Sequence, residues 1–81
     1  MNRIEIEDKI REMVSSQFGV SLEEVDLDTR FIEDLNADSL DAVEVVMLVE
    51  DEFNLKIPDE IADRFFSVKL VVEYIEKNIK S

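Results

Sequence analysis

Residues 34–53 read DLNADSLDAVEVVMLVEDEF, and this stretch contains the central helical pattern of the chain. From Ser39 to about Phe53 its apolar residues recur with the spacing of a helix, at about 100° per residue on a helical wheel. One arc of the wheel is the expected core face, and a second apolar arc faces away from most of it. The core arc contains Ala42, Val45, Val46, Val49 and Phe53, and the second arc contains Leu40, Val43 and Met47.

Two interpretations fit the second apolar arc. A helix that is apolar on nearly every side is usually well buried. Alternatively, the arc is an exposed strip with an acidic rim, typical of a surface that docks against a helix or groove carrying Arg and Lys. Its position beside Ser39 favours the exposed strip. The segment between Arg30 and Lys56 contains no basic residue and eight acidic ones, namely Glu33, Asp34, Asp38, Asp41, Glu44, Glu50, Asp51 and Glu52.

Ser39 is the single hydroxyl side chain in this acidic stretch. Its ordinary role would be structural, since either Asp38 or Ser39 would make a good N-cap for the helix. A serine nucleophile needs a neighbouring base, and the chain contains neither histidine nor cysteine. A lysine base is conceivable, but no lysine lies close in the sequence. Ser39 is therefore either a helix cap or a residue on which another enzyme acts.

Two other kinds of site are disfavoured by spacing and size. Asp26 and Asp28 mimic the first ligands of a calcium loop, but Phe31 and Ala37 stand where that loop requires Gly and Glu. Paired carboxylates could act as acid and base in a glycosidase, yet so short a chain leaves little room for the dry cleft that tunes a carboxyl pKa. We therefore expect neither a metal site nor enzyme activity.

Length and charge limit what this chain can be. With 81 residues, folding hides only about 60 to 65% of the unfolded surface, enough for one small core. We expect a single domain over residues 1–81. The net charge of -12 at pH 7 disfavours nucleic acid and anionic lipid as partners and favours proteins with basic patches.

The compartment is suggested by what the chain lacks. It has no cysteine, which suits a reducing compartment, and its amino terminus MNRIEIEDKI resembles neither a signal peptide nor a presequence. No apolar run approaches the roughly 18 residues of a membrane helix. We expect a mature, soluble, cytoplasmic protein without stable membrane insertion, while an organellar location after removal of a presequence stays open.

Helical periodicity recurs before the central stretch. Ile6, Ile10, Met13 and Val14 predict a first helix with one buried stripe, which Gly19 would end. Residues 19–38 form a long connection, in which Ser21-Leu-Glu-Glu24 is typical of a capping box that begins a short helical turn. Such a loop must be held by its own apolar side chains. We expect these to be Val20, Leu22, Val25, Leu27, Phe31, Ile32 and Leu35.

Two further helical segments follow the central stretch. Pro58 favours the start of a short turn over about Asp59 to Arg64, because its ring is preorganised for a first helical position. Ser67 can cap a last helix. The buried face of that helix is predicted at Val68, Val72, Ile75 and Ile79, which keep a period of 3.6.

These residues together resemble a known family. The motif Asp38-Ser39-Leu40 inside residues 34–53, followed by KIPDEIADRFFSVKLVVEYIE, is similar to the acyl carrier proteins of dissociated, type II fatty-acid synthases. The resemblance covers essentially the whole chain. It implies an all-α fold, a small four-helix bundle with a long first loop and a short third helix, and a monomer.

The resemblance also implies a function and a cofactor. Ser39 would carry 4'-phosphopantetheine through a phosphodiester, installed from coenzyme A and Mg²⁺ by holo-synthase, a phosphopantetheinyl transferase. Acyl chains would travel as thioesters on this arm between the enzymes of fatty acid biosynthesis. Basic patches on these enzymes would meet a docking face made of Asp38, Leu40, Asp41, Val43, Glu44, Met47, Glu50 and Asp51. The acyl chain would lie in a pocket made of Val46, Val49, Phe53, Ile57, Ile61, Val71 and Ile75.

Several alternatives stay open at this point. The chain could serve a polyketide, specialised lipid or aminoacyl pathway, or it could be an unmodified acidic adaptor that binds basic helices. Four positions differ from the common family pattern. Asn36 stands where many relatives have Gly, which matters if its φ is positive, and Ile61, Phe66 and Leu70 are apolar where relatives often carry polar or small side chains.

Overall fold

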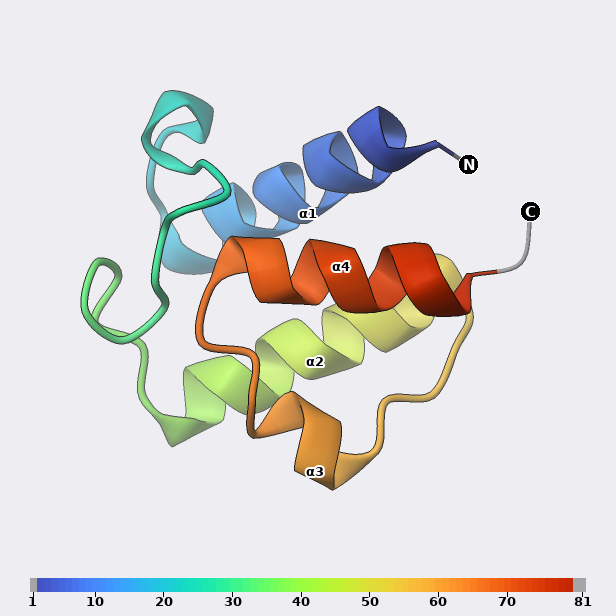
Figure 1. Cartoon of the computed structure of the whole chain (residues 1–81). Helices are drawn as coiled ribbons and strands as arrows, with labels where there is room; N and C mark the ends of the chain where they lie inside the picture. The colour runs from blue at the N-terminus through green and yellow to red at the C-terminus, as the bar shows by residue number, and fades with distance from the viewer. Residues whose placement is uncertain (1, 80–81) are drawn as a thin grey trace.

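The computed structural model describes residues 2–79, and these form four α-helices and one short 3₁₀ turn (Figure 1). The expected all-α fold is confirmed, with its long first connection and its short third helix. Within the described residues, β pairing is limited to an isolated bridge between Arg30 and Ser67. The elements are α1 (Arg3–Phe18), η1 (Leu22–Glu24), α2 (Ser39–Phe53), α3 (Asp59–Ala62) and α4 (Val68–Asn78).

The core forms where α1 packs against both α4 and α2, and buried side chains of all three helices belong to one cluster (Figure 1). The periodic stripes predicted on α1 and α4 are buried, and each fully buried aliphatic side chain contributes about 1.5–3 kcal/mol of transfer free energy. Met13 and Ile79 pack against the edge of this core and are only half-buried. The side chains with almost no exposed surface are Ile6, Ile10, Val14, Val25, Val49, Val68, Val71, Val72 and Ile75.

Caps define where the long helices begin and end. Gly19 ends α1 in the left-handed region with a φ of 66°, as its position in the sequence predicted. Asn54 ends α2 with a φ of 53°. The Ser67 side chain caps α4 by accepting from the Leu70 amide at 3.4 Å. These residues stop or start helices because they satisfy backbone groups that have no partner inside the helix.

Two predictions about the short elements were wrong in detail. The Ser21 side chain makes no capping hydrogen bond, so the 3₁₀ turn forms without the expected capping box. Pro58 is the N-cap of α3 rather than its first residue, and α3 ends at Ala62, before the expected Arg64. Beyond Ala62 the chain tightens, because the Arg64 amide donates to the Ile61 carbonyl at 2.9 Å in place of a regular α-helical bond.

The long connection is held against the start of α4 by backbone hydrogen bonds. The Lys69 amide donates to the Leu27 carbonyl at 3.0 Å, and the Val68 amide donates to the Thr29 carbonyl at 3.0 Å. Both amides belong to the first turn of α4, where a helix has no acceptor of its own. The Phe31 amide donates in return to the Phe66 carbonyl at 3.1 Å.

Side chains hold this connection less completely than predicted. Val25 and Phe31 are buried, and Val20, Leu27 and Leu35 pack against the core. Leu22 and Ile32 are 42% and 62% exposed, so for these two the expected anchoring role was wrong. Backbone hydrogen bonds and polar turns supply the missing restraint.

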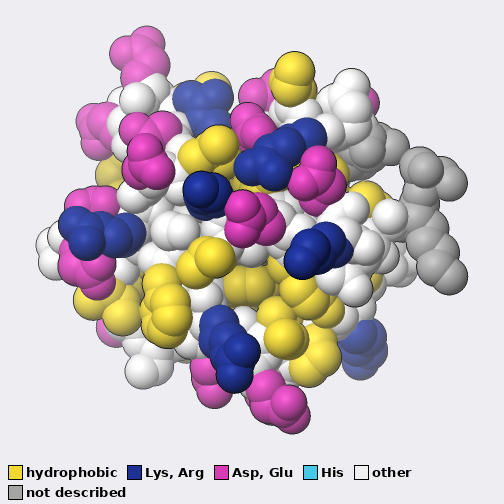
Figure 2. Space-filling view, viewed as in Figure 1, with side chains coloured by type: hydrophobic (Ala, Val, Ile, Leu, Met, Phe, Trp, Pro, Cys, Tyr) yellow, Lys and Arg dark blue, Asp and Glu magenta, His cyan; other side chains and the backbone are white. Residues whose placement is uncertain are grey.

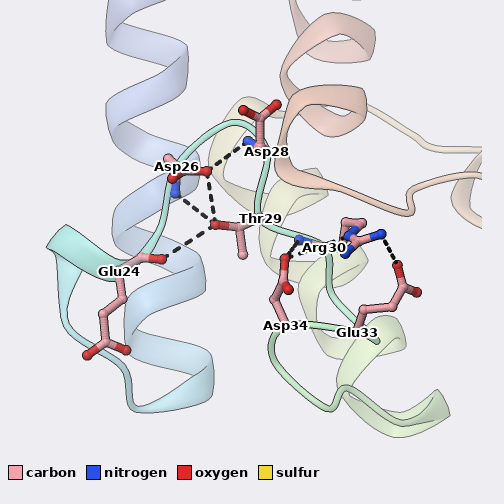
Figure 3. Close-up of polar contacts among 7 residues, drawn as sticks. All are labelled: Glu24, Asp26, Asp28, Thr29, Arg30, Glu33 and Asp34. Atoms are coloured by element: carbon pink, nitrogen blue, oxygen red, sulfur yellow. Dashed lines mark hydrogen bonds and ion pairs between the residues drawn. The ribbon is translucent and has the colours of Figure 1, made fainter.

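Figure 3 shows the polar turns of the connection. The Asp26 carboxylate accepts from the Asp28 amide at 2.9 Å, and the Thr29 hydroxyl accepts from the Asp26 amide at 2.9 Å. The Asp34 carboxylate accepts from the Arg30 amide at 2.8 Å, and the Arg30 guanidinium pairs with Glu33 at 3.2 Å. These contacts make Asp26 and Asp28 part of a self-contained turn. No cluster of His, Cys, Asp or Glu in the described chain is arranged to hold a metal ion.

Ion pairs join the helices at the surface. Arg3 donates to Glu7 at 2.8 Å and to Glu76 of α4 at 3.0 Å, and its hydrogen bond to Glu7 helps to raise the pKa of Arg3. Lys9 of α1 pairs with Glu52 of α2 at 3.1 Å. Figure 2 shows Lys and Arg mixed with Asp and Glu on the face that contains α4, and hydrophobic side chains gathered near α3. None of the described helices is both long and apolar enough to cross a bilayer.

Candidate functional site

Ser39 is the first residue of α2, and its side chain is exposed. The capping role belongs to Asp38, whose carboxylate accepts from the Asp41 amide at 2.9 Å. The Asp41 carboxylate accepts in turn from the Asp38 amide at 3.2 Å, which completes a capping box. Within residues 2–79, no intramolecular hydrogen bond uses the Ser39 hydroxyl. The helix therefore does not need this hydroxyl, which leaves it available for chemistry.

The backbone at the start of α2 favours an anion beside Ser39. The capping box uses the amides of Asp38 and Asp41, and the Ala42 amide donates to the Asp38 carbonyl. The amides of Ser39 and Leu40 have no acceptor within the described chain. Unpaired amides and the helix dipole together stabilise a phosphate group at a helix N-terminus.

The turn that precedes Ser39 has the unusual backbone that its sequence predicted. Asn36 has a φ of 54°, so the left-handed backbone that would make the exchange of Gly for Asn matter is present here. The Asn36 amide donates to the Ile32 carbonyl at 3.1 Å, and the Ala37 amide donates to the Phe31 carbonyl at 2.9 Å. These two bonds set the position from which α2 starts, and with it the position of Ser39.

Ser39 borders an open cleft of about 900 Å³. One wall is α2, and the other walls come from the end of the long connection and from α3 with the segment that leads to α4. Aromatic and aliphatic side chains line most of the cleft. Four carboxylates also line it, namely those of Asp38, Glu50, Asp59 and Asp63.

The residues predicted to form an acyl-chain pocket divide into two groups. Val46 and Ile57 line the cleft. Val49, Phe53, Val71 and Ile75 are buried in the core and are not part of the cleft lining, and Ile61 is half-buried against the core. A helical wheel separates an apolar arc from a polar one, but it does not show which part of the arc faces α3 and which part faces α1 and α4.

Aromatic residues outside α2 were missed as cleft residues. Phe18, Phe31, Phe65 and Phe66, four of the five phenylalanines of the chain, line the cleft. Phe18 and Phe31 pack together with their ring centroids 6.2 Å apart. The available signal was the adjacent pair Phe65 and Phe66 beside the short α3, whereas Phe18 at the end of α1 and Phe31 in the connection are isolated in the sequence.

The outer face of α2 is apolar and exposed. Leu40, Val43 and Met47 are 65%, 55% and 61% exposed, which excludes the interpretation that α2 is buried on all sides. Ala42, expected in the core, is exposed and lines the cleft, so that prediction was wrong. The strip therefore exists as a surface, and its role in docking stays a prediction.

The acidic residues predicted for the docking face differ in their surroundings. The Glu50 carboxylate accepts from the Ile57 amide at 2.8 Å, and the Glu44 carboxylate accepts from the Gln17 side chain. Asp38 and Asp41 form the capping box, while Asp51 is exposed. Four of these five carboxylates thus hold the local structure in addition to supplying negative charge.

Comparisons with known proteins agree with this geometry. A family model described as a phosphopantetheine attachment site matches residues 8–75, and this range includes Ser39 and the whole cleft lining. A curated acyl carrier protein from Akkermansia muciniphila is 51% identical over 72 residues, which cover 89% of this chain and 90% of that protein. The similarity therefore extends over nearly the full length of both proteins.

Proposed function

Because this chain belongs to the acyl carrier protein family, whose prosthetic group is a covalently attached 4'-phosphopantetheine, we propose that Ser39 is the attachment residue. One observation carries the proposal. The Ser39 hydroxyl is exposed at the N-terminus of α2, is not used by the helix cap and borders the cleft. Acyl carrier proteins are carriers rather than catalysts, so the arm would be installed by a separate enzyme.

The residues around Ser39 fit this group. The amides of Ser39 and Leu40 are available to its phosphate, and Asp38 keeps its carboxylate turned to the Asp41 amide. When attached, the arm supplies a terminal thiol that holds an acyl group as a thioester. The chain itself supplies the attachment hydroxyl, two amides and an apolar cleft.

We propose that the acyl groups are those of fatty acid biosynthesis by a dissociated synthase. An alkyl chain is apolar, and the cleft that Ser39 borders is lined largely by aliphatic and aromatic side chains such as Val46, Ile57 and Phe31. Burying methylene groups there is favourable by about 0.8 kcal/mol each. The mass of the acyl group on protein from the native cell would distinguish this pathway from polyketide, specialised lipid or aminoacyl pathways.

The proposed partners are the phosphopantetheinyl transferase and synthase enzymes with basic patches. The exposed strip of Leu40, Val43 and Met47, together with the exposed Asp51, supports docking by apolar contact and charge attraction. Electrostatic attraction gives fast association and a modest affinity that depends on salt, as a carrier with many partners requires. We also propose that the protein is a single domain, that it is a monomer and that it is located in the cytoplasm.

Modification of the purified apo protein tests the role of Ser39. Incubation with coenzyme A, Mg²⁺ and a phosphopantetheinyl transferase should add one phosphopantetheine, located by peptide mass analysis at Ser39. Ser39→Ala should prevent the addition, while Ser16→Ala, which removes an exposed hydroxyl from α1, should not. If several transferases left the protein unmodified and native material also carried no arm, the acidic adaptor would replace the carrier.

A further inference from the structure

The cleft beside Ser39 has an apolar rim on the side that α2 does not form. Ile32 of the long connection and Phe66 before α4 are 62% and 60% exposed, and both line the cleft. Val43 and Met47 of α2 line the same cleft and are similarly exposed. The exposed apolar side chains that line the cleft therefore come from more than one segment of the chain. Contiguous patches of this kind mark interaction sites more often than scattered single residues do.

Ile32 and Phe66 are held in place by the backbone. The Phe31 amide donates to the Phe66 carbonyl at 3.1 Å, and the neighbouring residues Arg30 and Ser67 form the isolated bridge. The Ile32 carbonyl accepts from the Asn36 amide at 3.1 Å. Because these bonds fix the connection and the start of α4 against each other, little order is lost when a partner covers both side chains.

We propose that Ile32 and Phe66 form a second docking contact for the phosphopantetheinyl transferase that acts on Ser39. This inference rests on the proposed attachment at Ser39. An enzyme that reaches the Ser39 hydroxyl approaches the cleft that Ser39 borders, and Ile32 and Phe66 line that same cleft. Docking by α2 alone would leave the aromatic ring of Phe66 in water.

Charge indicates the chemistry of the matching surface. Asp38, Asp59 and Asp63 line the same cleft and are exposed. A complementary enzyme surface carries Arg or Lys around an apolar patch that receives Phe66 and Ile32. Aromatic residues are enriched in interfaces, and a few buried side chains dominate the binding energy. Phe66 should therefore contribute more than Ile32.

The test uses the apo protein, in which neither the arm nor an acyl chain can account for an effect. Phe66→Ser should raise the KM of phosphopantetheine transfer about tenfold, and Ile32→Ser about threefold, with little change in kcat. Phe66→Leu keeps a large apolar side chain, so its KM should be close to the parent value. Ile4→Ser is the matched control, because Ile4 is 68% exposed on α1 outside the cleft, and its KM should stay within about twofold of the parent value.

The outcomes separate this inference from the proposed attachment. A KM for Phe66→Ser and Ile32→Ser equal to that of Ile4→Ser, with Ser39 still modified, overturns the second docking contact and leaves the attachment intact. Failure of several transferases to modify the parent protein, together with native material that carries no arm, overturns the attachment itself and this inference with it. Circular dichroism checks that each variant is folded, and if Phe66→Ser is not, the KM of Ile32→Ser decides alone.

Discussion

Removal of the Glu50 carboxylate should destabilise the fold, although Glu50 also belongs to the predicted docking face. Its carboxylate accepts from the Ile57 amide at 2.8 Å, and Ile57 is only 6% exposed. Glu50→Ala leaves this amide without its acceptor, and a hydrogen bond to a charged group contributes about 1.5–3 kcal/mol. The better helix propensity of Ala offsets a few tenths of this cost.

Thermal unfolding followed by circular dichroism at pH 7 measures the effect. For a domain of this size, a loss of about 2 kcal/mol lowers the Tm by roughly 8–16 °C. Glu50→Gln keeps an acceptor oxygen, so it should lower the Tm by less than half as much as Glu50→Ala. Asp51→Ala is the matched control, because Asp51 is its exposed neighbour on α2 and its removal lessens repulsion in a chain of charge -12. Equal stability of Glu50→Ala and Asp51→Ala would refute the structural role of Glu50.

Three further predictions concern the turn, the cap and the charge. Asn36→Gly should be neutral or slightly stabilising, whereas Asn36→Val should lower the free energy of unfolding by about 1 kcal/mol or more, because the φ of 54° is strained for a β-branched residue. A Val variant with the same Tm as the parent would contradict this. Asp38→Ala should lower the free energy of unfolding by about 1 kcal/mol and Ser39→Ala by much less, since Asp38 makes the cap. Denaturant unfolding measures both values, and a larger loss for Ser39→Ala would show that Ser39 is the cap. Salt should raise the Tm, and Asp51→Lys should keep or raise the Tm while it weakens the binding of a basic partner in titrations. If neither ionic strength nor Asp51→Lys changed that affinity, the acidic docking face would be refuted.

The elements with a local signal were predictable from the sequence. The buried stripes of α1 and α4 repeat every 3.6 residues, and Gly19 and Asn36, which have positive φ, are of the residue types that adopt it most readily. The start of α2 was predicted to within one residue, because both Asp38 and Ser39 are good N-caps, and the structure adds a capping box between Asp38 and Asp41. Where local chemistry was ambiguous, at Ser21 and Pro58, the predictions were wrong in detail.

The candidate site was predictable in part. From the residues alone Ser39 was either a helix cap or a residue on which another enzyme acts, and the resemblance of the motif Asp38-Ser39-Leu40 to the family singled it out as the proposed attachment residue. The cleft was not predictable to the same degree. Val46 and Val49 lie three residues apart on one arc of α2, yet Val46 lines the cleft and Val49 is buried in the core. The direction in which each side chain points depends on where α3 packs, and the short α3 carries almost no periodic signal.

The helical character of the chain, the end of α1 at Gly19, the cap of α4 at Ser67 and the acidic surface could be predicted from the sequence, because residue spacing, backbone preference and charge are properties of the chain itself. The sequence left Asp38 and Ser39 as alternative caps of α2, and the structure shows that the cap is Asp38. Packing between segments, which the sequence does not display, leaves the strip of Leu40, Val43 and Met47 exposed and brings phenylalanines distant in sequence to one cleft. The bonds that place the long connection against α4 join residues such as Leu27 and Lys69, and no local pattern specifies such a pairing.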